Sequence, residues 1–254
     1  MFEHKIPVFN PAPLRKEILE ALRDLALKEQ AARYGAYGDG ILAGCGLFER
    51  GGRVGVEEGV VKFAGRVYVL ARPESLPYQP ADAWTVLKIQ FSGETNTRDF
   101  QTFTGRLVLD ENTSLPPNEI ELGRFKLKRG SRLRTEYTDF RDMETEYDTV
   151  NLIHVPYAGI GEATLCPVIL THFAREAYPY AAEPLDIAFC GACLAQNGVM
   201  SRESIRLYLW RRLNMEGKQF ENRELHTHLA GLLAEMKGEA RQAGQGPSEG
   251  VLLM

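Results

Sequence analysis

Two runs of opposite charge stand side by side in the middle of the chain. The first holds six cations and no acid: Arg124, Lys126, Lys128, Arg129, Arg132 and Arg134. The second holds one arginine, Arg141, and six acids: Glu136, Asp139, Asp142, Glu144, Glu146 and Asp148. Alternate residues of a strand share a face, so the first three cations would form a row opposite Phe125 and Leu127. Such a row predicts either docking onto a neighbouring subunit or folding back onto the chain's own acidic loop.

In the docking interpretation, the interface takes Arg124, Lys126 and Lys128 from the basic row and Glu144 and Glu146 from the acidic run. The acidic run also supports a second class of function, because two facing carboxylates can hydrolyse a glycosidic bond. The spacing within residues 136–148 selects no particular pair of acids. The run lacks the D-x-[DN]-x-[DN]-G pattern of a calcium loop.

A CxxC motif, Cys190-Gly-Ala-Cys193, is a weak candidate for metal binding. A structural zinc site needs a second pair or histidines at ligand spacing, and Cys45 and Cys166 stand isolated. A redox dithiol would open a helix after a strand, which the preceding residues 187–189 allow. Buried thiols are the favoured interpretation, because free cysteine commonly packs as a small apolar residue. We therefore expect no metal and no cofactor.

Two further motifs predict no catalysis. His226 and His228 lie two apart in a helical pattern, so one should pack near the core and the other should meet solvent. The letters Gly246-Pro-Ser-Glu-Gly250 match a nucleophile elbow, which needs an acid and a histidine later in the chain. Four residues follow Gly250. We expect that the protein is not an enzyme.

Composition narrows the class of protein further. The 254 residues carry 34 acids and 30 bases, a formal net charge of −4, which argues against a dedicated nucleic-acid binder. The sequence lacks an apolar run of the ~20 residues that span a bilayer, so no membrane insertion is expected. Four cysteines in a chain of this length fit a reducing cytoplasm better than a disulfide framework.

The elements that must position these residues fall into four predicted segments. Residues 1–36 form a helical arm opened by Pro11 and Pro13 and ending near Arg33. Its apolar stripe recurs at helical spacing: Leu14, Ile18, Leu22 and Leu25. A partner or the chain's own β domain should cover this stripe, because isolated helices of this length are marginal in water.

Residues 37–130 form the second segment, an antiparallel β domain. Short apolar runs separated by glycine or proline predict strands at 41–48, 53–56, 60–63, 66–70, 85–91, 106–109 and 119–127. Runs 60–63 and 66–70 are two residues apart, the spacing of a tight hairpin. The pattern is typical of a β-sandwich or small barrel.

Residues 131–240 form a mixed, mostly helical third segment, and residues 241–254 a flexible tail. Pro167 marks one helix entry, and Ser201 and Asn222 are predicted to cap two later helices. The fold class is therefore α+β, with an N-terminal amphipathic helix, an antiparallel sandwich or small barrel, and a mostly helical C-terminal region.

Short apolar runs separated by glycines in the predicted β domain resemble those of a known protein family. The runs Asp39-Gly-Ile-Leu-Ala-Gly-Cys, Gly51-Gly-Arg-Val-Gly-Val and Glu58-Gly-Val-Val-Lys-Phe-Ala-Gly-Arg-Val-Tyr-Val-Leu resemble a module of baseplate and tail-fibre attachment proteins of tailed phages. The resemblance implies a prophage-encoded particle component without catalysis. It implies partners among other tail or baseplate subunits and further copies of itself, and assembly in the bacterial cytoplasm into a virion or phage-like particle.

The predicted function is thus a structural subunit of a phage or phage-like tail. Two alternatives from other classes stay open. One is the carboxylate-dependent hydrolase around residues 136–148. The other is a carbohydrate-binding module, in which Trp84, Tyr78 and Tyr137 would offer exposed rings.

Overall fold

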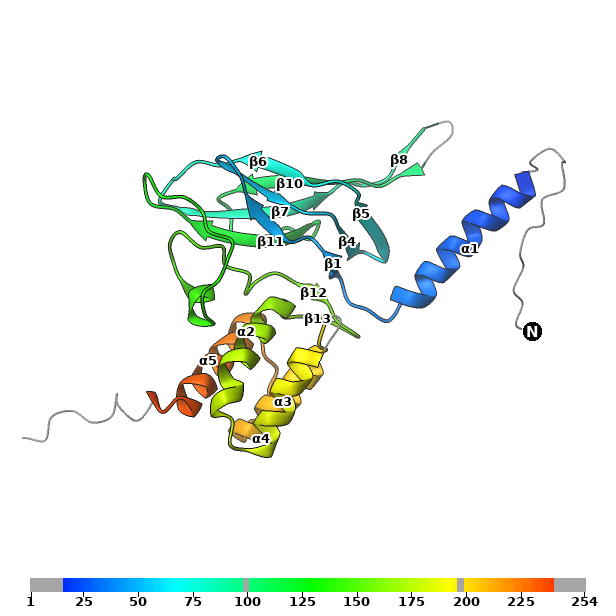
Figure 1. Ribbon diagram of the computed structural model, residues 1–254. Coiled ribbons are helices and arrows are strands. Elements are labelled where there is room, and N and C mark those ends of the chain that lie inside the picture. The colour runs from blue at the N-terminus through cyan, green and yellow to red at the C-terminus, as the bar shows by residue number, and fades with distance from the viewer. Residues whose placement is uncertain (1–15, 98–100, 196–198, 240–254) are drawn as a thin grey trace, which may run out of the picture. The chain divides into compact units, whose positions relative to one another are not determined.

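The computed structural model describes residues 16–97, 101–195 and 199–239, and the chain divides into two compact units. The first unit spans residues 1–37 and the second residues 38–254. Within the second unit, Figure 1 shows most of the strands in one group and helices α2 to α5 in another. The predicted α+β class is confirmed.

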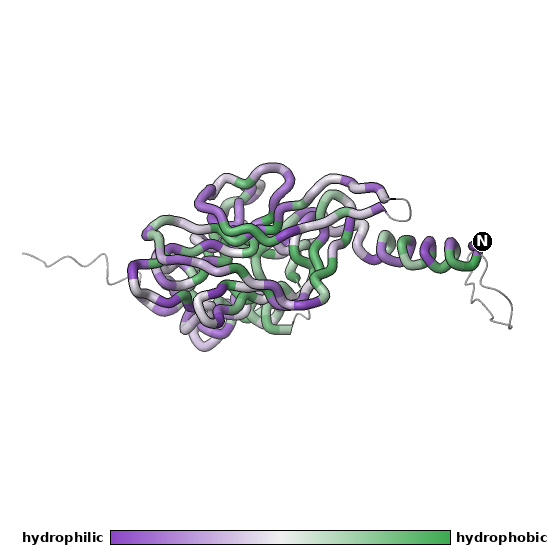
Figure 2. Tube along the Cα trace, turned by 90° about the horizontal axis from the view of Figure 1, so that it is seen from above, coloured by the Kyte–Doolittle hydropathy of each residue, from purple (hydrophilic) through white to green (hydrophobic). Residues whose placement is uncertain are grey.

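Helix α1 (Lys16–Tyr34) belongs to the first unit. The predicted start at Pro11 and Pro13, like Leu14 of the apolar stripe, lies outside the described residues. Ile18, Leu22 and Leu25 follow one another at steps of four and three, so they share one side of the helix. None of the residues of α1 is buried, and Figure 2 shows apolar and polar positions alternating along it.

The described strands of the second unit form four small sheets. Strand bounds are β1 Gly40–Gly44, β2 Leu47–Glu49, β3 Arg53–Val56, β4 Gly59–Phe63, β5 Arg66–Leu70, β6 Glu74–Pro77, β7 Trp84–Phe91, β8 Thr95–Asn96, β9 Gln101–Thr102, β10 Gly105–Asp110, β11 Glu119–Lys126, β12 Tyr157–Ala158 and β13 Ala163–Thr164. Their orders are β13-β12-β1-β4-β5, β10-β7-β11, β2-β3-β6 and β8-β9, so these strands do not close into a barrel. The predicted hairpin is β4–β5, paired from Gly59 opposite Leu70 to Phe63 opposite Arg66.

The predicted single strand over 41–48 is wrong. Gly44 and Cys45 both have positive φ, 66° and 58°, which ends β1 and redirects the chain into β2 of another sheet. Gly44 also lies so close to the Glu58 carbonyl that a Cβ atom would be 2.2 Å from it. Strand β6 was also not predicted, because Pro77 and the polar residues around it are typical of a loop.

Helix bounds in the second unit are α2 Pro167–Ala177, α3 Pro184–Ala195, α4 Arg202–Leu213 and α5 Asn222–Met236, with 3-10 turns η1 Arg141–Glu144 and η2 Tyr178–Tyr180. The Ser201 cap is confirmed, since its Oγ accepts a hydrogen bond from the Ser204 amide. The Asn222 cap is wrong: Glu221 is the cap residue, and the Asn222 side chain instead accepts a hydrogen bond from Arg202. None of the described helices is both long and apolar enough to cross a membrane.

The described residues of the second unit form two hydrophobic cores. One joins the sheets, with Leu87, Leu122 and Phe125 each at most 1% exposed. The other joins α2 to α5, around Phe173 and Leu229. The segment from Leu133 to Val155 supplies residues to both cores: Leu133, Val150 and Val155 to the first, Phe140, Met143 and Ile153 to the second.

Candidate functional site

The acidic run forms part of a polar cleft. The cleft encloses about 500 Å³ and is lined by Trp84, Arg124, Glu144, Glu146, Asn151, Ile153, His154 and Arg223. These residues come from β7, β11, the segment 144–154 and the first turn of α5. Long-range folding therefore assembles the cleft from four separate stretches of sequence.

The polar face of the β10-β7-β11 sheet provides one wall. In register, Trp84 of β7 pairs with Lys126 of β11, and Val86 pairs with Arg124. Residues paired across antiparallel strands lie side by side on one face, so Arg124 and Lys126 share the face of Trp84. Phe125 lies on the opposite, core-facing side, which confirms the predicted alternation.

Arg124 is held in place by a buried carboxylate. Its Nε and Nη2 donate to the two oxygens of Glu121 at 2.7 and 2.6 Å, and the Glu121 side chain has no exposed surface. The backbone of Arg124 also pairs with Asn151, which ties β11 to the segment 144–154. Docking through the basic row requires exposed side chains, but those of Arg124 and Lys126 are only 16% and 18% exposed.

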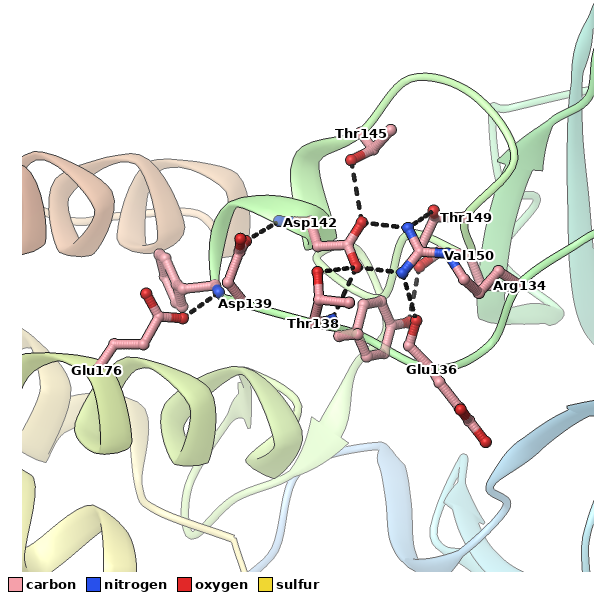
Figure 3. Close-up of polar contacts among 11 residues, drawn as sticks. Arg134, Glu136, Thr138, Asp139, Asp142, Thr145, Thr149, Val150 and Glu176 are labelled. Atoms are coloured by element: carbon pink, nitrogen blue, oxygen red, sulfur yellow. Dashed lines mark hydrogen bonds and ion pairs between the residues drawn. The ribbon is translucent and has the colours of Figure 1, made fainter.

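An ion pair between Arg134 and Asp142 shapes the acidic run (Figure 3). Both terminal nitrogens of Arg134 donate to the Asp142 carboxylate, which also accepts from the amide and hydroxyl of Thr138 at 2.9 and 3.1 Å. Arg134 further donates to the Thr149 hydroxyl at 2.9 Å. Hydrogen bonding from Arg134 lowers the pKa of Asp142 to about 2. Asp142 thus anchors η1, and the end of η1 sets the position of Glu144.

Glu144 reaches from the cleft to a buried histidine. Its Oε1 lies 2.9 Å from Nδ1 of His226, which is fully buried in α5 and stacks on Phe140 at 4.4 Å between ring centroids. Burial lowers the pKa of His226, so the ring is neutral at pH 7 and its Nδ1–H donates to Glu144. The prediction that one histidine of the pair is buried is confirmed, and His228 is half-buried against Phe220.

Glu146 folds back over the basic row. The Lys126 ammonium lies 2.9 Å from Glu146 Oε1, and the ammonium groups of Lys126 and Lys128 each lie 4.5 Å from the ring centroid of Tyr147. Hydrogen bonds that Lys126 donates to Tyr147 and Glu146 raise the pKa of Lys126. The structure thus shows the internal arrangement of these charges, and their contact with another subunit stays a prediction.

His154 and Arg223 add two donors to the cleft that sequence reasoning missed. Burial and the positive charge of Arg124 lower the pKa of His154. Among the described residues, no side-chain hydrogen bond or ion pair engages Arg223, which is exposed. A pattern search could not have found either residue, because both are isolated in the sequence and reach the cleft through the packing of α5 and the segment 144–154.

The CxxC motif lies inside a helix. Cys190 and Cys193 fall in the second half of α3 and are buried, so the expectation that the motif could open a helix after a strand is wrong. Burial raises the pKa of Cys190 to about 11 and of Cys193 to about 12, the opposite of a reactive thiol. Within the described part of the chain, no cluster of three His, Cys, Asp or Glu residues could hold a metal ion.

The three rings proposed for sugar binding have different surroundings. The Tyr78 hydroxyl accepts from the Leu133 amide, and the Tyr137 hydroxyl donates to the Val150 carbonyl at 2.7 Å, so both tyrosines are held against the cores. Trp84 is half-buried and lines the cleft. Of the three, Trp84 is therefore the ring placed to meet a ligand in this cleft.

No protein-family model and no curated protein sequence matches the chain. Among solved structures, a crystal structure of TssK aligns with 99% of this chain and 70% of its own, at a TM-score of 0.40 and 11% identity. A cryo-electron microscopy structure of the TssK-TssF-TssG baseplate subcomplex of the type VI secretion system aligns with 92% of this chain and 100% of its own, at a TM-score of 0.38 and 12% identity. Both similarities are weak.

Proposed function

We propose that the chain is a structural subunit of a phage or phage-like tail, in the baseplate or where a fibre attaches, and that it acts by assembly. Its partners are other tail subunits and further copies of itself. The assignment to a phage-like particle is based on residues 39–70, whose apolar runs and turn glycines resemble those of baseplate and tail-fibre attachment proteins. The proposal places the protein in a virion or phage-like particle that is assembled in the bacterial cytoplasm.

The observation that carries the proposal is the uncovered apolar side of α1. This helix of 19 residues has no buried residue and belongs to a compact unit of its own. On this side, Leu22 and Leu25 are 40% and 49% exposed. A helix of this length is marginal alone in water, and covering an apolar side chain contributes roughly 1.5–3 kcal/mol. A subunit partner would supply that cover.

The test introduces charge into the apolar stripe of α1 and leaves the sequence of the second unit unchanged. Leu22→Glu with Leu25→Glu should abolish incorporation into particles purified from the producing cells. The melting temperature of the second unit should not change, because neither leucine is buried. Leu207→Glu is the matched control, since Leu207 of α4 is 52% exposed and lies outside α1.

Two readouts decide the outcome. Light scattering after size exclusion reports self-association, and the protein content of purified particles reports incorporation. Normal incorporation of the double variant would contradict the assembly role of α1. Equal loss in the Leu207→Glu control would show that any added surface charge blocks assembly, and would contradict it too.

A further inference from the structure

Three polar side chains of the cleft, those of Glu144, Glu146 and Asn151, are each fixed by one hydrogen bond and keep a second polar atom unused. Oε1 of Glu144 accepts from His226, and Oε1 of Glu146 accepts from Lys126. Oδ1 of Asn151 accepts from the Ile153 amide at 2.9 Å. Among the described residues, Oε2 of each glutamate and Nδ2 of Asn151 have no hydrogen-bond partner. The cleft therefore offers oriented acceptors and an oriented amide donor.

Further donors and a flat ring complete the lining. No described partner engages the guanidinium of Arg223, the imidazole of His154 or the indole N–H of Trp84, and all three line the cleft. The volume of about 500 Å³ falls within the roughly 300–1,000 Å³ of small-molecule sites. An aromatic face beside a few oriented polar groups is the usual composition of such a site.

The balance of charge selects the class of ligand. Glu146 is paired with Lys126, and Arg124 is paired with the buried Glu121, so Glu144 and Arg223 are the opposite charges that remain in the cleft. Glu144 would repel a phosphate or a carboxylate, and Arg223 would repel a cation. A hydroxyl group both donates and accepts, so it matches a lining that mixes the two.

We propose that this cleft binds a neutral saccharide, with the ring of Trp84 as the apolar platform. Glu144 and Glu146 accept from sugar hydroxyls, and Asn151 and Arg223 donate to them. The site does not depend on the assembly role proposed for α1, because the cleft lies wholly within the second unit.

The chain supplies its own internal reference for the test, because it contains two tryptophans. Trp210 donates its indole N–H to the Lys218 carbonyl and does not line the cleft. The two indole N–H signals of the ¹⁵N-labelled full-length protein are assigned with Trp84→Phe. Four neutral probes are titrated at millimolar concentration: maltotriose, cellotriose, triacetylchitotriose and mannotriose. We expect at least one to shift the Trp84 signal saturably, while Trp210 stays still and inorganic phosphate has no effect.

Variants then locate the binding. Arg223→Ala should weaken the active probe at least tenfold at an unchanged melting temperature, since its side chain has no partner among the described residues. Trp84→Ala should abolish binding, and Trp84→Phe should retain part of it, which separates loss of the ring from loss of folding. Arg211→Ala, an exposed arginine of α4 away from the cleft, is the charge-matched control.

Four results would overturn the proposal: no shift of Trp84 with any of the four probes, an equal shift of Trp210, a stronger response to phosphate than to sugar, or equal weakening by Arg211→Ala.

Discussion

Glu144 and His226, 82 positions apart in the sequence, are joined by a hydrogen bond of 2.9 Å between Oε1 and Nδ1. The bond ties the end of η1 to α5, and the ring of His226 also stacks on Phe140. The other nitrogen, Nε2, is buried without a hydrogen-bond partner among the described residues. A proton added there would place an unsatisfied N–H in the core, so the fold favours the neutral ring.

This arrangement predicts that stability falls on mild acidification. The pKa of His226 in the folded protein is lowered by burial, below the ~6.5 of an unfolded histidine. The unfolded chain therefore takes up the proton first, and the free energy of unfolding decreases as pH falls below about 6.5. Urea unfolding at pH 7.5 and 5.5 should show this loss, and a smaller one in His226→Gln. His154, whose pKa is also lowered, contributes a slope in both proteins.

His228→Gln is the control for this measurement, because His228 is half-buried and lies outside the Glu144 contact. The same pH dependence in wild type and His226→Gln would contradict the assignment to His226.

The Arg134–Asp142 pair predicts a second pH range, at lower pH, in which the free energy of unfolding changes. Asp142→Asn should reduce the free energy of unfolding at pH 7 by about 1–2 kcal/mol, the lower part of the range for bonds to charged groups, because the Arg134 side chain is 42% exposed. The carboxylate's contribution is present above about pH 4 and is lost toward pH 2. The difference between wild type and variant should therefore shrink with acid. Glu136→Gln is the control, since its carboxylate points away from the cluster (Figure 3). A constant difference from pH 7 to pH 2 would contradict the ionic role.

Removing Arg124 should destabilise the fold through Glu121. Arg124→Met leaves a fully buried carboxylate without its two charged donors, and breaking a buried pair costs about 3–5 kcal/mol. We expect about 2–4 kcal/mol, because Arg124 keeps some exposure. Glu121→Leu added to Arg124→Met should recover most of that loss, as measured by urea unfolding. Failure of the double variant to recover would show that Arg124 stabilises through its packing rather than through the pair.

Lys128 is better suited than Arg124 or Lys126 to test whether the basic row docks onto a partner. It is exposed and contacts the face of Tyr147, so Lys128→Glu should change the melting temperature little. If the row faces an acidic surface on a partner, assembly should weaken, and more at low than at high salt. Assembly that is unaffected at 50 mM salt would leave the row with its internal role alone.

The two helical cysteines should be slow to react. With pKa values of about 11 and 12, Cys190 and Cys193 hold almost no thiolate at pH 8. In the native protein, a thiol reagent should label them far more slowly than in urea. Changing both to alanine should cost about 1–3 kcal/mol through lost packing, without release of zinc. Stoichiometric zinc in the purified protein, lost in the double variant, would contradict the packing role.

Patterns of local origin could be predicted from the sequence. The alternation of Phe125 with its charged neighbours, the β4–β5 hairpin and the Ser201 cap each depend on residues close together, and each is confirmed. Helix α3 was not predicted because it is apolar nearly all round, so it shows no amphipathic period.

The cleft could not be predicted for a different reason. Trp84 and Arg223 are far apart in the chain, and no spacing rule connects them. The acids of the run separate in the same way: Asp142 bonds to Arg134, Glu144 to His226 and Glu146 to Lys126. These three acids look alike in the sequence, but tertiary contacts place each of them in a different environment.

The segment from Leu133 to Val155 has a consequence for how the second unit unfolds. Its apolar residues alternate between the two cores, so neither core can open without withdrawing side chains from the other. The sheets and the helices should therefore melt together, in one cooperative transition with coincident fluorescence and circular dichroism midpoints. A fold of two cores then behaves thermodynamically as one, with this segment as the part that couples them.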